Sequence, residues 1–167
     1  MKTFKIIFGD VTSPIGDGKK LICHIVNDQG LMGSGVAKAL FDKWPIVRHE
    51  YIRWYNECQR VENKDFFNLG DVQFVVCEPN IYVANMVAQH MVGSDEFGNP
   101  PIRYDALNTC LRYILKVGIK ALRIDSIHIP YKMGADRAGG DWNKIVKMLE
   151  NTFCKNGISV TAYKWNG

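Results

Sequence analysis

The 167-residue chain has the length of one domain, and its composition excludes a membrane-spanning protein and argues against a nucleic-acid-binding one. Hydrophobic residues make up 47% and charged residues 23%, as in ordinary globular domains, and no apolar run approaches the roughly 20 residues that cross a bilayer. The net charge of +4 suits an anionic ligand, but the basic residues are scattered rather than gathered as on nucleic-acid-binding surfaces. We therefore expect a single domain over residues 1–167, one principal site and no membrane partner.

The amino-terminal segment and the cysteines indicate a cytoplasmic protein. The first residues carry lysines, but their apolar run is too short for a signal peptide and no small-residue cleavage site follows. The five cysteines are an odd number, with no Cys-x-x-Cys pair and no histidine at zinc-ligand spacing. We expect reduced thiols, no metal and no cofactor.

Six apolar runs rich in β-branched and aromatic residues predict strands. They cover residues 4–8, 21–26, 74–77, 81–87, 122–129 and 158–163. The second run is nearly all apolar, which is typical of a strand covered by helices on both faces. Pro79-Asn80 separates two runs so closely that they should form an antiparallel hairpin. The pattern predicts a central mixed, largely parallel six-stranded sheet.

Four helices are expected between these strands. Apolar positions recur at helical spacing over residues 36–44 and 47–58, with a break at Pro45. They recur again over 104–115, with Gly118 as a stop, and over 142–153, before Asn156-Gly157. Strands alternating with helices predict a three-layer α/β/α fold. A polar stretch at 94–101 should be an exposed loop that could form part of a binding rim.

The glycine-rich segment at residues 27–36 (NDQGLMGSGV) lies between a predicted strand and a predicted helix. Glycines at 30, 33 and 35 let backbone amides approach an anion, and the helix start adds a partial positive charge. It lacks the Gly-Lys-Ser/Thr end of a Walker loop, and Lys38 replaces the third glycine of a dinucleotide fingerprint. The alternative is a plain strand-to-helix turn. We expect a phosphate at Gly33, Ser34, Gly35 and Val36.

A second glycine-rich segment, residues 133–142 (MGADRAGGDW), again joins a strand to a helix, with Asp141 as the expected N-cap. In open α/β sheets, ligands lie beyond the carboxyl ends of strands. If the two strands are neighbours, both loops would hold one diphosphate. The candidate contacts of the second loop are Met133, Gly134, Ala135, Arg137, Ala138 and Gly139.

Two further side chains are candidates with ordinary alternatives. Asp10 follows the first strand, where a carboxylate could accept a hydrogen bond from an exocyclic amine such as that of adenine, or simply occupy a turn. His24 interrupts an apolar strand shortly before Asn27. It is either a hydrogen-bonded core residue or an acid or base at the phosphate loop.

Three segments in this order resemble the macrodomain family over nearly the whole chain. They are Gly9-Asp10-Val11-Thr12, then Asn27 with Gly33-Ser34-Gly35-Val36-Ala37, then Ile129-Pro130 followed by the second glycine-rich loop and Asp141-Trp142. His24 and the run from Gly33 make the chain most similar to one branch of that family. This branch contains the terminal ADP-ribose glycohydrolase of glutamate-linked chains and the yeast-type ADP-ribose 1″-phosphate phosphatase.

The resemblance implies a binding mode for ADP-ribose. Asp10 and Val11 would hold the adenine, with Trp165 covering it as an aromatic lid. Residues 33–36 and 134–139 would enclose the diphosphate and distal ribose, and Asn27 would face that ribose.

The chain departs from the family's catalytic residues. Residues 85–89 contain no lysine for the covalent glycohydrolase mechanism, and Ala138 and Ala37 stand where two branches carry an aspartate. His24, Asn27 and Asp136 remain as catalytic candidates that could position water.

Three functional hypotheses follow from these residues. The leading one is a hydrolase of ADP-ribose 1″-phosphate or of ADP-ribosylated substrates, and the alternative is a reader that binds ADP-ribose without turnover. A third, nucleic-acid binding, has only a modest patch in its favour, made of Arg48, Arg53, Trp54, Tyr55 and Arg60. The sequence leaves open the linkage cleaved, and whether the target is free nucleotide, ADP-ribosylated protein or nucleic acid.

Overall fold

A computed structural model describes residues 1–61 and 67–165. The elements in chain order are β1 (Phe4–Phe8), β2 (Lys20–Asn27), α1 (Gly35–Lys43), α2 (Ile46–Val61), β3 (Val72–Glu78), β4 (Ile81–Gln89), α3 (Tyr104–Tyr113), the π-helical turn η1 (Ile114–Gly118), α4 (Ile119–Leu122), β5 (Ser126–Pro130), α5 (Trp142–Thr152), the 3₁₀ turn η2 (Cys154–Asn156) and β6 (Ser159–Lys164). Among the described residues, no helix has the length and apolar character that crossing a bilayer requires.

The six strands form one sheet in the order β1-β6-β5-β2-β4-β3. All neighbouring pairs run parallel except β3 and β4, which form an antiparallel hairpin around Pro79 and Asn80. The predicted mixed, largely parallel sheet is therefore confirmed. The order also makes β2 and β5 direct neighbours, so the two glycine-rich segments leave the sheet side by side at its carboxyl edge.

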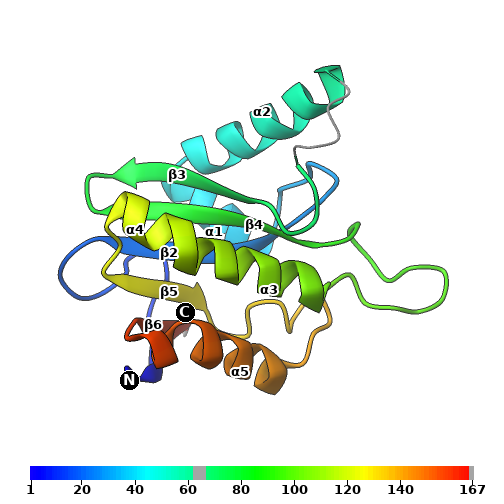
Figure 1. Cartoon of the computed structure of the whole chain (residues 1–167). Coiled ribbons are helices and arrows are strands. Elements are labelled where there is room, and N and C mark those ends of the chain that lie inside the picture. Colours follow the sequence, from blue (N-terminus) through cyan, green and yellow to red (C-terminus); the bar gives the residue numbers. More distant parts are fainter. Residues whose placement is uncertain (62–66, 166–167) are drawn as a thin grey trace.

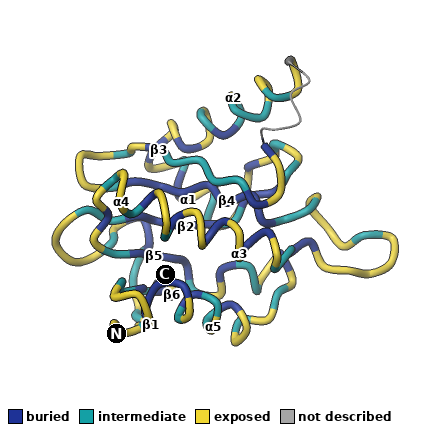
Figure 2. The backbone as a smooth tube through the Cα atoms, in the orientation of Figure 1, coloured by how far each residue is buried: buried dark blue, intermediate teal, exposed yellow. Residues whose placement is uncertain are grey.

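Helices cover both faces of the sheet (Figure 1). Side chains alternate along β2, so Leu21 and Cys23 join the core beneath α3 and α5, whereas Ile22 and Val26 join the core beneath α1 and α2. The backbone of β2 and β4 is dark along almost its whole length in Figure 2, because both strands are covered from both sides. The three-layer α/β/α prediction is confirmed.

Two predicted boundaries are wrong, and both lie between residues 114 and 125. Gly118 does not stop a helix: the chain widens into η1 and continues through α4, which ends at Arg123 with φ of 56°. A Cβ on Gly118 would lie 2.5 Å from Cζ of Phe74, so this glycine permits close packing of the helix on β3. The strand expected from residue 122 begins instead at Ser126, because residues before it complete the helix and its turn.

Candidate functional site

The two glycine-rich loops meet over one cavity. We call residues 28–34 the first loop and residues 131–141 the second loop. A cavity of about 300 Å³ lies between them at the carboxyl ends of β2 and β5. Eleven of the predicted site residues line it: His24, Asn27, Gly33, Ser34, Gly35, Val36, Met133, Gly134, Asp136, Arg137 and Ala138.

The remaining predicted residues do not line this cavity. Ala135 and Gly139 belong to the second loop but are not among the lining residues. Asp10, Val11 and Trp165 follow β1 and β6, the two strands that lie beyond β5 in the sheet. The Asp10 carboxylate accepts hydrogen bonds from Thr12 N (2.9 Å) and Thr12 Oγ1 (2.7 Å). The Trp165 side chain is 69% exposed. Their role as adenine contacts stays a prediction.

The first loop is held from below by Asn27. Its Oδ1 accepts hydrogen bonds from Gln29 N (3.0 Å) and Leu31 N (3.2 Å), and its Nδ2 donates to Leu31 O (2.6 Å). The hydroxyl of Tyr51 on α2 donates to Asn27 O (2.6 Å) and lies 3.0 Å from Oδ1. The side chain of Asn27 thus shapes the backbone that faces the cavity.

A second tie fastens the first loop to the segment after β4. Oδ1 of Asp28 accepts from Met91 N (2.8 Å), and Oδ2 lies 2.7 Å from Nδ1 of His90. Burial raises the pKa of the Asp28 carboxyl, but hydrogen bonds from Gln29, His90 and Met91 outweigh this and the net pKa lies below its ordinary value. The predicted exposed loop at 94–101 projects from the body of the molecule just beyond this tie (Figure 1).

The second loop is held by its own backbone. Ala135 N donates to Lys132 O (2.8 Å), and Gly140 N donates to Gly134 O (2.8 Å). A Cβ on Gly140 would lie 2.5 Å from Gly134 O, and one on Gly134 would lie 2.8 Å from Cδ1 of Ile25. Glycine is required at both positions because the loop folds tightly on itself and on β2. The loop then ends at Asp141, whose Oδ1 accepts from Asn143 N (3.0 Å), as predicted for an N-cap.

One side chain bridges the two loops. Nη1 of Arg137 donates to Oγ of Ser34, and the guanidinium lies near the place where a Cβ of Gly35 would be. In the part of the chain that the structure describes, Arg137 forms no ion pair. With Lys132, it gives the cavity wall two cationic side chains against the single carboxylate of Asp136, so the cavity favours an anion.

His24 lies in the cavity wall and in a buried polar chain. Asn85 Nδ2 donates to Gln73 Oε1 (3.0 Å), so Asn85 turns its Oδ1 to His24, and the imidazole donates from Nε2. Burial lowers the pKa of His24 to about 4, against a smaller opposite effect of Asn85. Within the described residues Nδ1 forms no hydrogen bond, and His24 is one of the residues that line the cavity.

Several wall residues were not predicted. Gln89 is the last residue of β4 and Val92 follows it, whereas Pro130 ends β5 and Tyr131 and Lys132 begin the second loop. The position of Gln89 follows from β4 lying beside β2, which no local pattern in the sequence reveals. The group of residues from 130 directly precedes the predicted loop, and the rule that ligands lie at strand ends could have included it. Within the described residues, no cluster of His, Cys, Asp and Glu could hold a metal.

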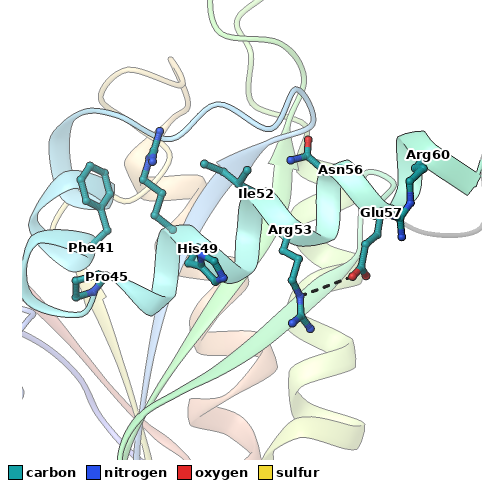
Figure 3. Close-up of a pocket in the computed structure, with 9 residues that line it drawn as sticks. Phe41, Pro45, His49, Ile52, Arg53, Asn56, Glu57 and Arg60 are labelled. Carbon is teal, nitrogen blue, oxygen red and sulfur yellow. Dashed lines mark ion pairs between the residues drawn. The ribbon is translucent and has the colours of Figure 1, made fainter.

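A larger hollow of about 700 Å³ lies over the outer side of α2 (Figure 3), with Pro45, Ile52 and Arg60 among its walls. Its wall residues come almost entirely from one helix, whose interior amides are committed to the helix itself. Arg53 is shared between Glu50 (3.5 Å) and Glu57 (3.7 Å). The hollow therefore lacks the free loop amides that favour a phosphate in the loop cavity, and we take the loop cavity as the candidate site.

Comparison with solved structures identifies the class of protein. A protein of unknown function from Bacteroides thetaiotaomicron has 39% sequence identity over 98% of each chain, with a TM-score of 0.88. A macrodomain protein from Streptomyces coelicolor has 34% identity over 96% of this chain and 98% of its own, with a TM-score of 0.79. Thermosipho africanus DarTG, solved in complex with ADP-ribose, has 18% identity over 98% of this chain and 42% of its own, with a TM-score of 0.69, a likeness of fold. No family model and no curated protein matches the sequence.

The chain is an α/β domain whose two glycine-rich loops enclose a cavity at the carboxyl edge of its sheet. The identity to the Streptomyces coelicolor protein along almost the whole of both chains goes further than fold. The chain belongs to the macrodomain family.

Proposed function

We propose that this macrodomain binds ADP-ribose or a close derivative in the cavity between its two glycine-rich loops. The observation that carries the proposal is the meeting of both loops over one cavity at the carboxyl ends of the adjacent strands β2 and β5. Its volume of about 300 Å³ lies at the lower end of the range of small-molecule sites. The complex of Thermosipho africanus DarTG with ADP-ribose supports the choice of ligand.

The charge of the cavity supports a diphosphate in particular. The backbone of the first loop and the start of α1 present amides and a helix amino terminus, which favour a phosphate. Arg137 and Lys132 add two cations. Adenine would lie toward β1 and β6, where Asp10, Val11 and Trp165 stand.

The test is calorimetric titration with ADP-ribose, using two matched glycine variants. Gly33 lines the cavity, and a Cβ there would meet no atom within 4 Å, so Gly33→Val should leave the fold intact and abolish binding by filling the phosphate position. Gly93 is equally open but lies outside this cavity, so Gly93→Val should bind as the unaltered protein does. Equal affinity in all three proteins would contradict the site.

Gly33 is a cleaner choice for this test than Gly35. Gly35 has φ of +64°, so a β-branched residue there strains the backbone as well as blocking the ligand. Loss of binding in such a variant would have two explanations.

Hydrolysis of the bound ligand is the second candidate function, and one observation favours it: Asp136 and His24 both line the cavity. His24, with a pKa of about 4, is neutral near pH 7 and is therefore a weak base and not a proton donor. The Asp136 carboxylate is exposed to the cavity and is the better group to activate water. Asn27 is occupied with its own loop and would act by orienting that loop.

Phosphate release from ADP-ribose 1″-phosphate tests this candidate. A phosphatase should lose release in Asp136→Asn while keeping affinity for ADP-ribose, and His24→Gln should lose less. Binding without release in the unaltered protein would leave a reader, or a hydrolase of ADP-ribosylated protein or nucleic acid. Membership of the branch that contains the terminal glycohydrolase and the yeast-type phosphatase stays a proposal drawn from the sequence. So does a cytoplasmic location.

A further inference from the structure

Among the described residues, one side-chain hydrogen bond joins the two loops, and it runs from Arg137 to Ser34. The guanidinium reaches from the second loop across the cavity to the first loop, and it lies close to Gly35, the first residue of α1. A phosphate bound at the amino terminus of α1 would occupy the same neighbourhood.

The bond to Ser34 leaves most of the hydrogen-bonding capacity of Arg137 unused. A guanidinium has five N–H donors in a planar fork, and only Nη1 has an acceptor in the described residues. The side chain is exposed and forms no ion pair there. A neutral hydroxyl is a weaker acceptor for this cation than a phosphate oxygen, which forms charge-assisted and often bidentate bonds.

We propose that Arg137 is a latch that exchanges the Ser34 hydroxyl for the bridging diphosphate of the ligand. In the free protein it ties the two loops together across the cavity, and in the complex its fork binds phosphate oxygens. The inference rests on the proposed function and adds to it a specificity-determining side chain. It makes affinity depend on the two negative charges of a diphosphate, so that ligands without them bind poorly.

Titration with ADP-ribose at low and high salt tests the exchange. Arg137→Leu should weaken binding by about 10- to 100-fold at low salt, the loss expected for a hydrogen-bonded charge, and the loss should shrink as salt rises. Arg137→Lys keeps the charge without the fork and should recover part of the affinity. Arg112→Leu removes an exposed cation from α3, outside the cavity, and should bind as the unaltered protein does.

A Ser34→Ala variant separates the latch from a passive tie. It breaks the same bond between the loops but leaves the guanidinium and the Ser34 amide available for phosphate, so its loss of affinity should be well below that of Arg137→Leu. A loss as large as that of Arg137→Leu, or unchanged affinity in Arg137→Leu, would overturn the proposal. Thermal melting of each variant checks that the fold persists.

Two further ligands identify which phosphate is bound and separate this inference from the proposed function. The loss in Arg137→Leu should be the same for ADP-ribose and ADP-ribose 1″-phosphate, and a loss confined to the second would overturn the assignment to the diphosphate. If the unaltered protein binds inorganic pyrophosphate through Arg137 but does not bind ADP-ribose, the proposed function fails and the anion latch stands. If it binds neither, both fail.

Discussion

The two loops that enclose the cavity are held in place by different means. The first loop is held by side chains beneath it, with Asn27 bonded to three of its backbone atoms and Tyr51 supporting Asn27. The second loop is held by its own backbone turns, which close only because Gly134 and Gly140 have no side chain. Removal of a polar side-chain group should therefore destabilise the first loop. Addition of a side-chain atom at a glycine should destabilise the second.

The largest expected effect comes from a feature common to both loops. Each loop follows a strand that contains a buried histidine, His24 in β2 and His128 in β5. Burial lowers the pKa of both His24 and His128 to about 4, from an ordinary value near 6.5. The unfolded chain therefore takes up protons first as the pH falls, so stability is complete above about pH 6.5 and is lost toward pH 4. Each histidine should account for roughly 3 kcal/mol of that loss.

Urea unfolding of the unaltered protein, His24→Gln and His128→Gln from pH 7 to pH 4 measures this effect. Each variant should lose less stability on acidification than the unaltered protein does. Parallel pH profiles in all three proteins would show that neither buried histidine contributes.

The next prediction distinguishes the two loops by their tolerance of an added Cβ. Gly140→Ala places a Cβ 2.5 Å from Gly134 O and 3.2 Å from Cδ1 of Ile145, so the second loop must shift, at about 2–3 kcal/mol. Gly33→Ala in the first loop meets no atom within 4 Å and should change the free energy of unfolding by less than about 0.5 kcal/mol. Denaturation of both variants side by side checks the contrast, and equal losses would remove it.

More of the fold than of the site can be predicted from the sequence. Periodicity and breakers such as Pro45 and Pro79 predict all six strands and the main helices, because these signals are local. Gly118 misleads because its reason is a contact with Phe74, from a strand far away in sequence. The glycines of the two loops predict anion sites, and this stays a prediction. The support that Asn27 gives to the first loop involves Tyr51, and the place of Gln89 in the cavity wall depends on β4 lying beside β2, and neither can be seen in a local pattern.

Removal of the support beneath the first loop should have a smaller effect than the change at Gly140. Asn27→Ala leaves Leu31 O and the amides of Gln29 and Leu31 without their partners, but water can reach this exposed loop. We expect a loss of about 2 kcal/mol and weaker ADP-ribose binding. Asn27→Asp keeps the acceptor for the two amides but sets a carboxylate oxygen against Leu31 O, so it should recover only part of the stability while adding a negative charge that further weakens binding. An Asn27→Ala variant with unaltered affinity would contradict the support role.

The smallest effect should come from Tyr51→Phe. This change removes the hydroxyl that donates to Asn27 O (2.6 Å) and keeps the ring packed against Phe67. The free energy of unfolding should fall by about 1 kcal/mol. The affinity of the protein for pyrophosphate should stay unchanged. Calorimetry and urea unfolding on one sample measure both quantities, and a loss as large as that of Asn27→Ala would place the main support in Tyr51.

The pairing of β1 with β6 determines the order in which the strands of the domain can assemble. Phe4 at the start of β1 lies opposite Val160 in β6, and among the described strands β1 pairs with β6 alone. During translation β1 emerges long before β6 has been synthesised. It therefore stays unpaired while β2, β4 and β5 can already form sheet hydrogen bonds. Contacts so distant in sequence form slowly because a long stretch of chain must be closed first. The edge that carries Asp10 and Trp165 is therefore the last part of the sheet to be completed during synthesis.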